Sequence, residues 1–286
     1  MSATIWEFTD DRGVRSTAGR RPERIVAYLR AGAGLWEHGI TPAGVYGSGH
    51  DGDSVDPVKA GRLPADVPYL GAGKTLDAET LGAVAPELIV DVTYDEHFAY
   101  AVDDGTAGSL GVPVVALSVA GQTSLSRIVD RFAELAASLG AVPDTSGQAA
   151  LDAAREAVRR AAGRPRAPRV LVLSAAGPQQ VHLARPEAWP ELRHLSELGV
   201  RLVDPGPGPG VNWLTAGWDH AARLGADLIL ADARGNAVPA AELTGVTDWR
   251  SLTHDRPVLP WNPELAPAAG ACATFLQEVA DGLSAV

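Results

Sequence analysis

One stretch of the sequence decides the fold class: Leu76-Asp-Ala-Glu-Thr-Leu-Gly-Ala-Val-Ala-Pro-Glu-Leu-Ile-Val90. Its first part has the composition of a helix that ends before Pro86, and the aliphatic run that follows is typical of a buried strand. A shorter version returns in the second half of the chain, where Asp219 precedes Ala226-Asp-Leu-Ile-Leu230 at the spacing at which Glu79 precedes Pro86. One helix–strand unit in each half predicts two similar α/β parts.

Strand-like runs and helical stretches alternate along the rest of the chain. The expected strands are residues 24–27, 42–46, 87–90, 113–117, 170–173, 201–203 and 228–230. Because strands separated by helices form βαβ units, this alternation predicts mostly parallel sheets. Residues 124–163 have little strand character, and Ile128, Phe132 and Leu135 recur there at helical spacing. We therefore expect α/β lobes over residues 1–123 and 164–286, a helical bridge over 124–163, and a final helix over 268–283.

The composition excludes several classes of protein. The 286 residues include 24 Lys and Arg against 35 Asp and Glu, a formal net charge of −11, so the chain lacks the basic surface that nucleic acids and anionic membranes require. Cys272 is the single cysteine, which excludes an internal disulfide and a cysteine-rich metal centre. No apolar run is long enough to span a membrane, and residues 1–13 do not have the pattern of a signal peptide.

The order and spacing of several segments resemble a known family, the ABC-importer substrate-binding proteins for ferric siderophores and cobalamin. These are the class III, helix-bridged periplasmic binding proteins. Residues 6–13, 21–27 and 76–90 resemble the N-lobe, and residues 124–163, 169–174, 181–184 and 219–232 resemble the bridge and the C-lobe. The resemblance implies two Rossmann-like lobes joined by a long bridging helix, with a ligand cleft between them. The general rule that open α/β sheets bind ligands at the carboxyl ends of their strands agrees with this expectation.

The loops that follow the expected strands supply the candidate ligand-binding residues. They are Tyr46, His50, Tyr94, His97, Gln122, His182, Arg185, Trp213, Arg234 and Trp261, with Ser118, Asn212 and Asn262 beside them. The set combines aromatic surface with hydrogen-bond donors, as an amphipathic chelate of modest charge requires. A ferric siderophore brings its own oxygen ligands, so we expect no protein metal ligands and no cofactor.

Two acidic residues fall where the family carries one acidic side chain per lobe to engage arginines of the importer's membrane subunits. These residues are Glu79 and Asp219. Two charges on a rigid protein steer its encounter with a partner and fix one orientation. Both residues also lie early in an expected helix, where a carboxylate stabilises the helix N-terminus by about 0.3–1 kcal/mol, so either interpretation fits.

Other motifs resemble nucleotide, calcium or catalytic sites but have simpler explanations. Gly47-Ser-Gly-His-Asp-Gly52 matches a dinucleotide-binding pattern, but Asp51, Asp53 and Asp56 would repel phosphate, and Pro57 is expected to break any helix there. The same three aspartates lack the spacing of a calcium loop. No hydrolase elbow, P-loop or zinc-protease motif is present, and Ser48, His50 and Asp51 are neighbours in one loop rather than a catalytic geometry, so no enzyme is expected.

The sequence thus predicts a monomeric solute-binding protein that captures a ferric siderophore and delivers it to ABC-transporter permease subunits. The acidic net charge favours a neutral or cationic chelate of the hydroxamate type. By resemblance the protein is extracytoplasmic and tethered to a membrane. Because the sequence shows no export signal or lipobox cysteine, a cytoplasmic re-use of the fold, as a metallophore-handling protein or a pathway enzyme, stays open. So does direct metal binding, if His50, His97 and His182 converge.

Overall fold

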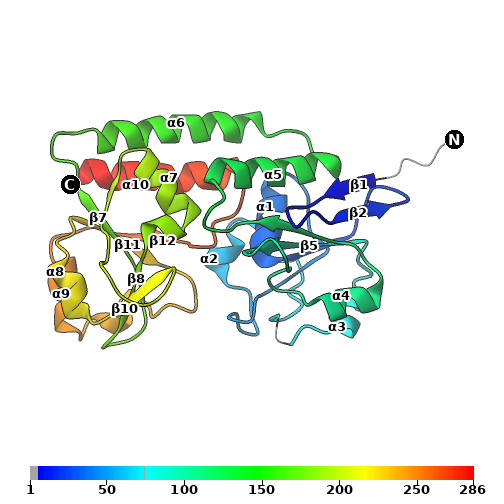
Figure 1. The fold of residues 1–286 in the computed structure, drawn as a ribbon, viewed down its shortest axis with the longest axis horizontal. Coiled ribbons are helices and arrows are strands. Elements are labelled where there is room, and N and C mark those ends of the chain that lie inside the picture. Colours follow the sequence, from blue (N-terminus) through cyan, green and yellow to red (C-terminus); the bar gives the residue numbers. More distant parts are fainter. Residues whose placement is uncertain (1–5, 74) are drawn as a thin grey trace. The chain divides into compact units, whose positions relative to one another are not determined.

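The computed structural model describes residues 6–73 and 75–286 of the chain. These residues divide into two units, each with helices packed on a sheet of its own (Figure 1). Unit 1 contains the described residues up to Thr145 and the later segment Glu264–Ala271, and unit 2 contains Ser146–Pro263 and Cys272–Val286. The predicted α/β class is confirmed. The division falls inside the predicted bridge, so that its first helix belongs to unit 1 and its second to unit 2.

Unit 1 is built on a four-stranded parallel sheet in the order β4-β3-β5-β6. The strands are β3 (Ile25–Tyr28), β4 (Gly44–Tyr46), β5 (Leu88–Thr93) and β6 (Val114–Ser118), with the antiparallel pair β1 (Trp6–Thr9) and β2 (Arg15–Ala18) apart from them. The helices are α1 (Leu29–Glu37), α2 (Pro57–Ala60), α3 (Ala78–Ala83), α4 (Asp104–Leu110) and α5 (Leu125–Ser138). Every residue of β3 and β5 is buried, as continuous apolar runs in a sheet covered on both faces should be.

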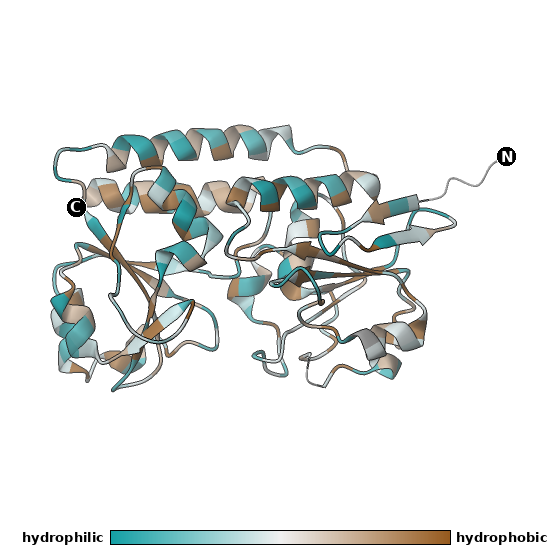
Figure 2. Cartoon of the chain, in the orientation of Figure 1, coloured by the Kyte–Doolittle hydropathy of each residue, from teal (hydrophilic) through white to brown (hydrophobic). Residues whose placement is uncertain are grey.

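Unit 2 has a six-stranded sheet of mixed direction. Four strands are parallel to one another: β9 (Arg201–Leu202), β7 (Arg169–Ala175), β11 (Leu228–Asp232) and β12 (Val258–Trp261). At one edge, β8 (Val181–Ala184) pairs antiparallel with β7 on one side and with β10 (Trp213–Ala216) on the other. The α-helices are α6 (Thr145–Ala162), α7 (Pro190–Glu197), α8 (Trp218–Arg223), α9 (Thr247–Thr253) and α10 (Ala269–Ala285), with short 3₁₀ helices η1 (Pro186–Ala188) and η2 (Ala240–Leu243). Figure 2 shows hydrophobic residues concentrated along the central strands of each unit.

Three of the departures from the predicted elements have a clear physical reason. Strands β8 and β10 were not among the predicted strands, because an antiparallel edge pair of four residues each has no βαβ spacing. Strand β12 contains Pro260, a residue that argues against a central strand but is accepted at the edge of a sheet. Pro57 does not break a helix but begins α2, since Asp56 caps the helix and proline is well suited to a first turn.

The return segment Glu264–Ala271 packs onto unit 1 at a glycine of α1. A Cβ atom placed on Gly34 would lie 2.7 Å from Cγ of Pro267 and 2.9 Å from its Cδ, closer than carbon atoms can approach. The proline ring is rigid, so it cannot move aside as a flexible side chain would. Gly34 therefore permits the close contact between α1 and the return segment.

We expect Gly34→Ala to destabilise the protein by about 1–3 kcal/mol, because the added methyl group overpacks this contact. Gly108→Ala is the matched control, since Gly108 lies in α4 with no atom within 4 Å of its ideal Cβ position. Alanine should there stabilise the helix by up to about 1 kcal/mol. Urea unfolding measures the change in the free energy of unfolding for each variant. Equal changes would contradict the role of Gly34 in the close contact with Pro267.

Candidate functional site

A cavity in unit 2 lies at the carboxyl ends of β7 and β11 and against the antiparallel pair of β8 and β10. Its volume is about 740 Å³, within the range of small-molecule sites. Three of the predicted residues line it: His182, Trp213 and Arg234. The other lining residues are Ser174, Ala175, Ala176, Gly210, Val211, Asn212, Thr215, Asn236 and Val238. The structure thus brings together a histidine, a tryptophan and several uncharged donors from segments far apart in the sequence.

His182 and Trp213 are positioned by the pairing of β8 with β10. The register places Thr215 directly opposite His182, and Nδ1 of His182 lies 2.9 Å from Oγ1 of Thr215. The imidazole lies beside the indole of Trp213, with 6.2 Å between ring centroids. The hydrogen bond therefore fixes the orientation of the imidazole at the cavity wall.

Three tryptophans pack behind the cavity. Trp213 lies 4.9 Å from Trp189 and 5.7 Å from Trp261 between ring centroids, and Trp189 and Trp261 are 5.3 Å apart. Trp261, a predicted ligand contact, is 1% exposed and donates from Nε1 to Glu191, so it supports Trp213 from below and offers no surface of its own. Edge-on aromatic packing of this kind adds about 0.5–1.5 kcal/mol per pair beyond burial. The result is a rigid aromatic wall.

Arg185 shapes the loop that closes one side of the cavity. Its guanidinium donates to the carbonyl oxygens of Gly206, Gly208 and Gly210, at distances of 2.8–3.0 Å. Those three glycines have φ angles of 92°, 151° and 93°, which side-chain-bearing residues rarely adopt. The predicted ligand-binding side chain is therefore engaged with backbone carbonyls, and it acts here by holding the loop in place.

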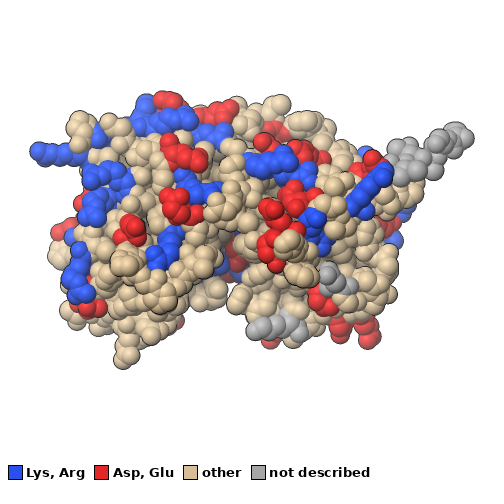
Figure 3. Space-filling view, in the orientation of Figure 1, with Lys and Arg blue, Asp and Glu red and all other residues tan. Residues whose placement is uncertain are grey.

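Arg234 is the charged side chain among the described residues that line this cavity, and a buried carboxylate neutralises it. Asp232 ends β11, and its Oδ1 and Oδ2 accept from Nε and Nη2 of Arg234 at 3.0 and 2.8 Å. A two-point bond between a guanidinium and a carboxylate is strong and orients both groups. The cavity consequently presents donors with little net charge, and the surface over β8 and β10 on the face drawn in Figure 3 is also mostly uncharged.

In unit 1, an aromatic surface follows β5. Tyr94 is 41% exposed, and its ring lies 4.8 Å from that of Tyr100, which in turn packs on Tyr28 at 5.6 Å. Nη1 of Arg30 lies 3.4 Å from the hydroxyl oxygen of Tyr94, and the neighbouring Phe98 is exposed. Burial around the hydroxyl group raises the pKa of Tyr94, so the phenol is neutral at physiological pH. The surface offers stacking area and phenol groups.

A buried network beneath this surface holds its loop. Asp91 in β5 is fully buried and accepts from the backbone N–H groups of Ala101 and Val102, at 3.0 and 2.9 Å. The hydroxyl group of Tyr46 also donates to Asp91, at 3.1 Å. Tyr46 is itself fully buried, so this predicted residue positions the loop that carries Tyr94 and has no exposed surface for a ligand.

Lys59 ties two further segments together in unit 1. Its ammonium group lies 2.7 Å from carboxylate oxygens of both Asp51 and Glu264, and Glu264 also accepts from the hydroxyl group of Tyr28. Burial alone would lower the pKa of Lys59, but the two carboxylates raise it above its ordinary value. Lys59 and Glu264 could not be recognised from the sequence as an ion pair, because nothing in the local sequence joins residues so far apart.

The remaining predicted residues lie in exposed loops. His50, His97 and Gln122 are all exposed, and as ligand contacts they stay predictions. The suspected group of Ser48, His50 and Asp51 is structural, because Asp51 accepts from Ser48 and pairs with Lys59. Within residues 6–73 and 75–286, no group of three His, Cys, Asp or Glu side chains is arranged to hold a metal ion.

Comparison with solved structures identifies the fold. No family model matches the sequence, and no curated protein matches it. Among solved structures, the chain is similar to DesE, a ferric-siderophore receptor protein from Streptomyces coelicolor, with 27% sequence identity and a TM-score of 0.85 over 98% of both chains.

The chain has the fold of the class III periplasmic binding proteins.

Solved structures of lower sequence identity share the fold. The siderophore periplasmic binding protein from the fuscachelin gene cluster of Thermobifida fusca is 18% identical, with a TM-score of 0.67 over 93% of this chain and 97% of that one. FhuD from Vibrio cholerae, solved with Fe³⁺-Desferal bound, is 18% identical, with a TM-score of 0.64 over 92% and 98% of the two chains. These relatives are binding proteins rather than enzymes.

The two acidic residues that the family resemblance singled out are exposed. Glu79 lies in the first turn of α3 and Asp219 in the first turn of α8. Asp219 pairs with Arg223 one turn later, at 2.8 Å, and this bond lowers the pKa of Asp219. Each carboxylate also lies at a helix N-terminus. No helix in the described part of the chain is both long enough and apolar enough to cross a membrane.

The buried carboxyl of Asp91 predicts a pH dependence of stability. Burial raises its pKa to about 6, so between about pH 4 and pH 6 the folded protein keeps a proton that the unfolded chain releases. The wild-type protein should therefore lose up to about 3 kcal/mol of stability relative to Asp91→Asn as the pH rises through that window. Denaturant unfolding of both proteins from pH 4 to 7 measures the difference in their free energies of unfolding. A difference that does not change with pH would contradict the raised pKa of Asp91.

Proposed function

We propose that this protein binds a ferric siderophore of the hydroxamate type and delivers it to an ABC importer. The observation that carries the proposal is the similarity to DesE, described as a ferric-siderophore receptor, over 98% of both chains. The cavity of unit 2 supports it independently, because its lining combines an aromatic wall with hydrogen-bond donors and contains no arrangement of metal ligands among the described residues.

The low net charge of the cavity favours hydroxamates over catecholates. Three hydroxamate groups, each with one negative charge, neutralise Fe³⁺, whereas three catecholate groups leave a strongly anionic complex. A strongly anionic ligand would need unpaired cationic side chains to replace its hydration. In the cavity Arg234 is paired with Asp232, and Arg185 is engaged with three backbone carbonyls. These pairings fit a neutral chelate.

The proposed binding mode uses the cavity of unit 2. In unit 2, Trp213 stacks against the organic backbone of the chelate, while His182, Thr215 and Asn236 hydrogen-bond to its hydroxamate and amide oxygens. The iron stays in the oxygen shell of the siderophore throughout, so the protein needs no metal ligand.

Fluorescence titration tests the proposal. Ferrioxamine B should quench the tryptophan emission of the wild-type protein with saturable, stoichiometric binding. Trp213→Leu should weaken that binding by about tenfold or more, because a buried stacking group is worth roughly 1.5–3 kcal/mol. Trp36→Leu, in α1 of unit 1, is the matched control and should leave the affinity unchanged. No binding of ferrioxamine B or of any other ferric trihydroxamate would refute the proposal.

For delivery, we propose that Glu79 and Asp219 contact the importer, so that the protein acts in an extracytoplasmic location. The double variant Glu79→Gln with Asp219→Asn should keep its affinity for ferrioxamine B and lose most ferrioxamine-dependent iron uptake in cells that depend on this protein. Exchange of two other exposed carboxylates, Glu156→Gln with Asp152→Asn in α6, is the control. Equal uptake by both double variants would contradict the role of Glu79 and Asp219.

A further inference from the structure

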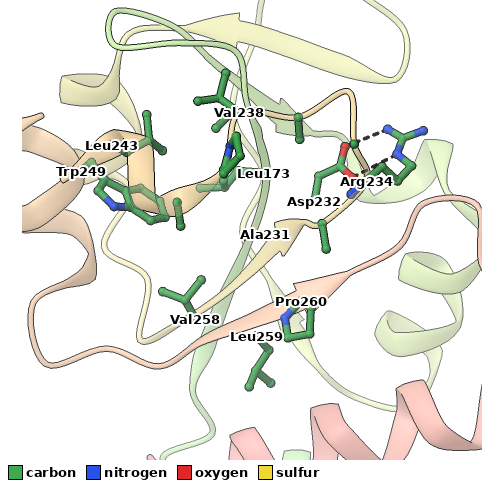
Figure 4. Close-up of a pocket in the computed structure, with 16 residues that line it drawn as sticks. Leu173, Ala231, Asp232, Arg234, Val238, Leu243, Trp249, Val258, Leu259 and Pro260 are labelled. Atoms are coloured by element: carbon green, nitrogen blue, oxygen red, sulfur yellow. Dashed lines mark hydrogen bonds and ion pairs between the residues drawn. The ribbon is translucent and has the colours of Figure 1, made fainter. Parts of the chain in front are cut away.

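A second cavity in unit 2 lies next to the first, and the side chain of Arg234 lines both (Figure 4). Its volume is about 330 Å³. One wall is a face of the sheet, where Leu173 of β7, Ala231 of β11 and Val258 of β12 contribute side chains. The opposite wall comes from η2 and α9, through Leu243 and Trp249. The cavity is therefore formed by regular elements and not by a loop alone.

The second cavity is apolar. Apart from the indole nitrogen of Trp249, its polar side chains are Asp232 and Arg234, and Figure 4 shows these two paired with each other at one end. Trp249 packs edge-on against Trp218, with 5.2 Å between ring centroids, and both rings are buried. A cavity of this chemistry holds water poorly and gains free energy when it takes up an apolar group.

The two cavities adjoin at the carboxyl ends of β7 and β11. Ala175, Arg234 and Val238 line both of them. The Asp232–Arg234 pair stands at this boundary, with the polar cavity on one side and the apolar cavity on the other. One molecule can therefore place a polar part in the first cavity and an apolar part in the second.

We propose that the second cavity binds an aliphatic or aromatic appendage of the siderophore whose iron-bearing part occupies the first cavity. The inference rests on the proposed function and narrows its ligand to siderophores with an apolar arm. The available volume exceeds the roughly 150 Å³ of an apolar cavity that takes up benzene, so a short acyl chain or one aromatic ring fits. The paired Arg234 marks the point at which the ligand changes from polar to apolar.

Two acylated forms of ferrioxamine B test the inference. Its terminal amine is converted to the acetyl or the hexanoyl amide, so that both probes have the same charge and the same iron centre and differ only in chain length. Burial of a methylene group strengthens binding by about fourfold. We expect the hexanoyl form to bind at least about tenfold more tightly than the acetyl form, measured by tryptophan quenching or calorimetry.

Variants that fill the second cavity give the decisive comparison. Ala231→Leu and, independently, Ala240→Leu should abolish the preference for the hexanoyl form and leave the affinity for the acetyl form within about twofold. Ala240 and Ala241 are exposed neighbours in η2, but only Ala240 is among the described residues that line the cavity. Ala241→Leu is therefore the matched control and should keep the preference. Thermal unfolding identifies the variants that remain folded.

The outcomes separate the inference from the function on which it rests. Equal affinity of the wild-type protein for both probes overturns the inference and leaves the proposed function in place. A preference that survives in the folded cavity-filling variants also overturns it, because the acyl chain then binds elsewhere. If neither probe binds, both the proposed function and the inference fail.

Discussion

The parallel sheet is the constraint on which the rest of each unit depends. Parallel strands all end at one edge, so the residues that follow them gather there whatever their separation in the chain. In unit 2 this edge assembles Ser174, Asp232 and Arg234, and in unit 1 it assembles Asp91 and the loop that carries Tyr94. The antiparallel pair of β8 and β10 adds the wall that turns the edge in unit 2 into a cavity.

Buried polar contacts then hold the surfaces built on these edges. The carboxylates of Asp51 and Glu264 meet at Lys59, and Asp91 binds the backbone of the loop after β5. Such pairs contribute little net stability, because the cost of removing charges from water offsets much of their attraction. They stabilise one arrangement of the loops over others, since any other arrangement would leave a charge buried without a partner. A binding surface of mostly uncharged groups can thus be rigid.

Much of the architecture could be predicted from the sequence, whereas much of the site could not. The helix–strand repeat at Glu79 and Asp219 predicted two α/β parts because local periodicity encodes elements directly. Loop positions likewise predicted His182, Trp213 and Arg234, which line one cavity. Tyr46, Arg185 and Trp261 have suitable side chains at suitable loops, yet each is engaged with the protein itself. Residue type and position do not reveal whether a group's hydrogen bonds are already used, because its partners come from distant segments.

The return segment Glu264–Ala271 gives unit 1 a discontinuous chain. Its Glu264 is one of the two carboxylates that pair with Lys59, and its Pro267 packs on Gly34, so the N-terminal part lacks this second counter-charge and a packed wall until the late segment arrives. During synthesis on a ribosome, nearly the whole polypeptide must therefore emerge before unit 1 can complete its core. The order of translation and the order of folding therefore differ, and a chaperone would meet unit 1 with its four sheet strands synthesised but its core still partly exposed.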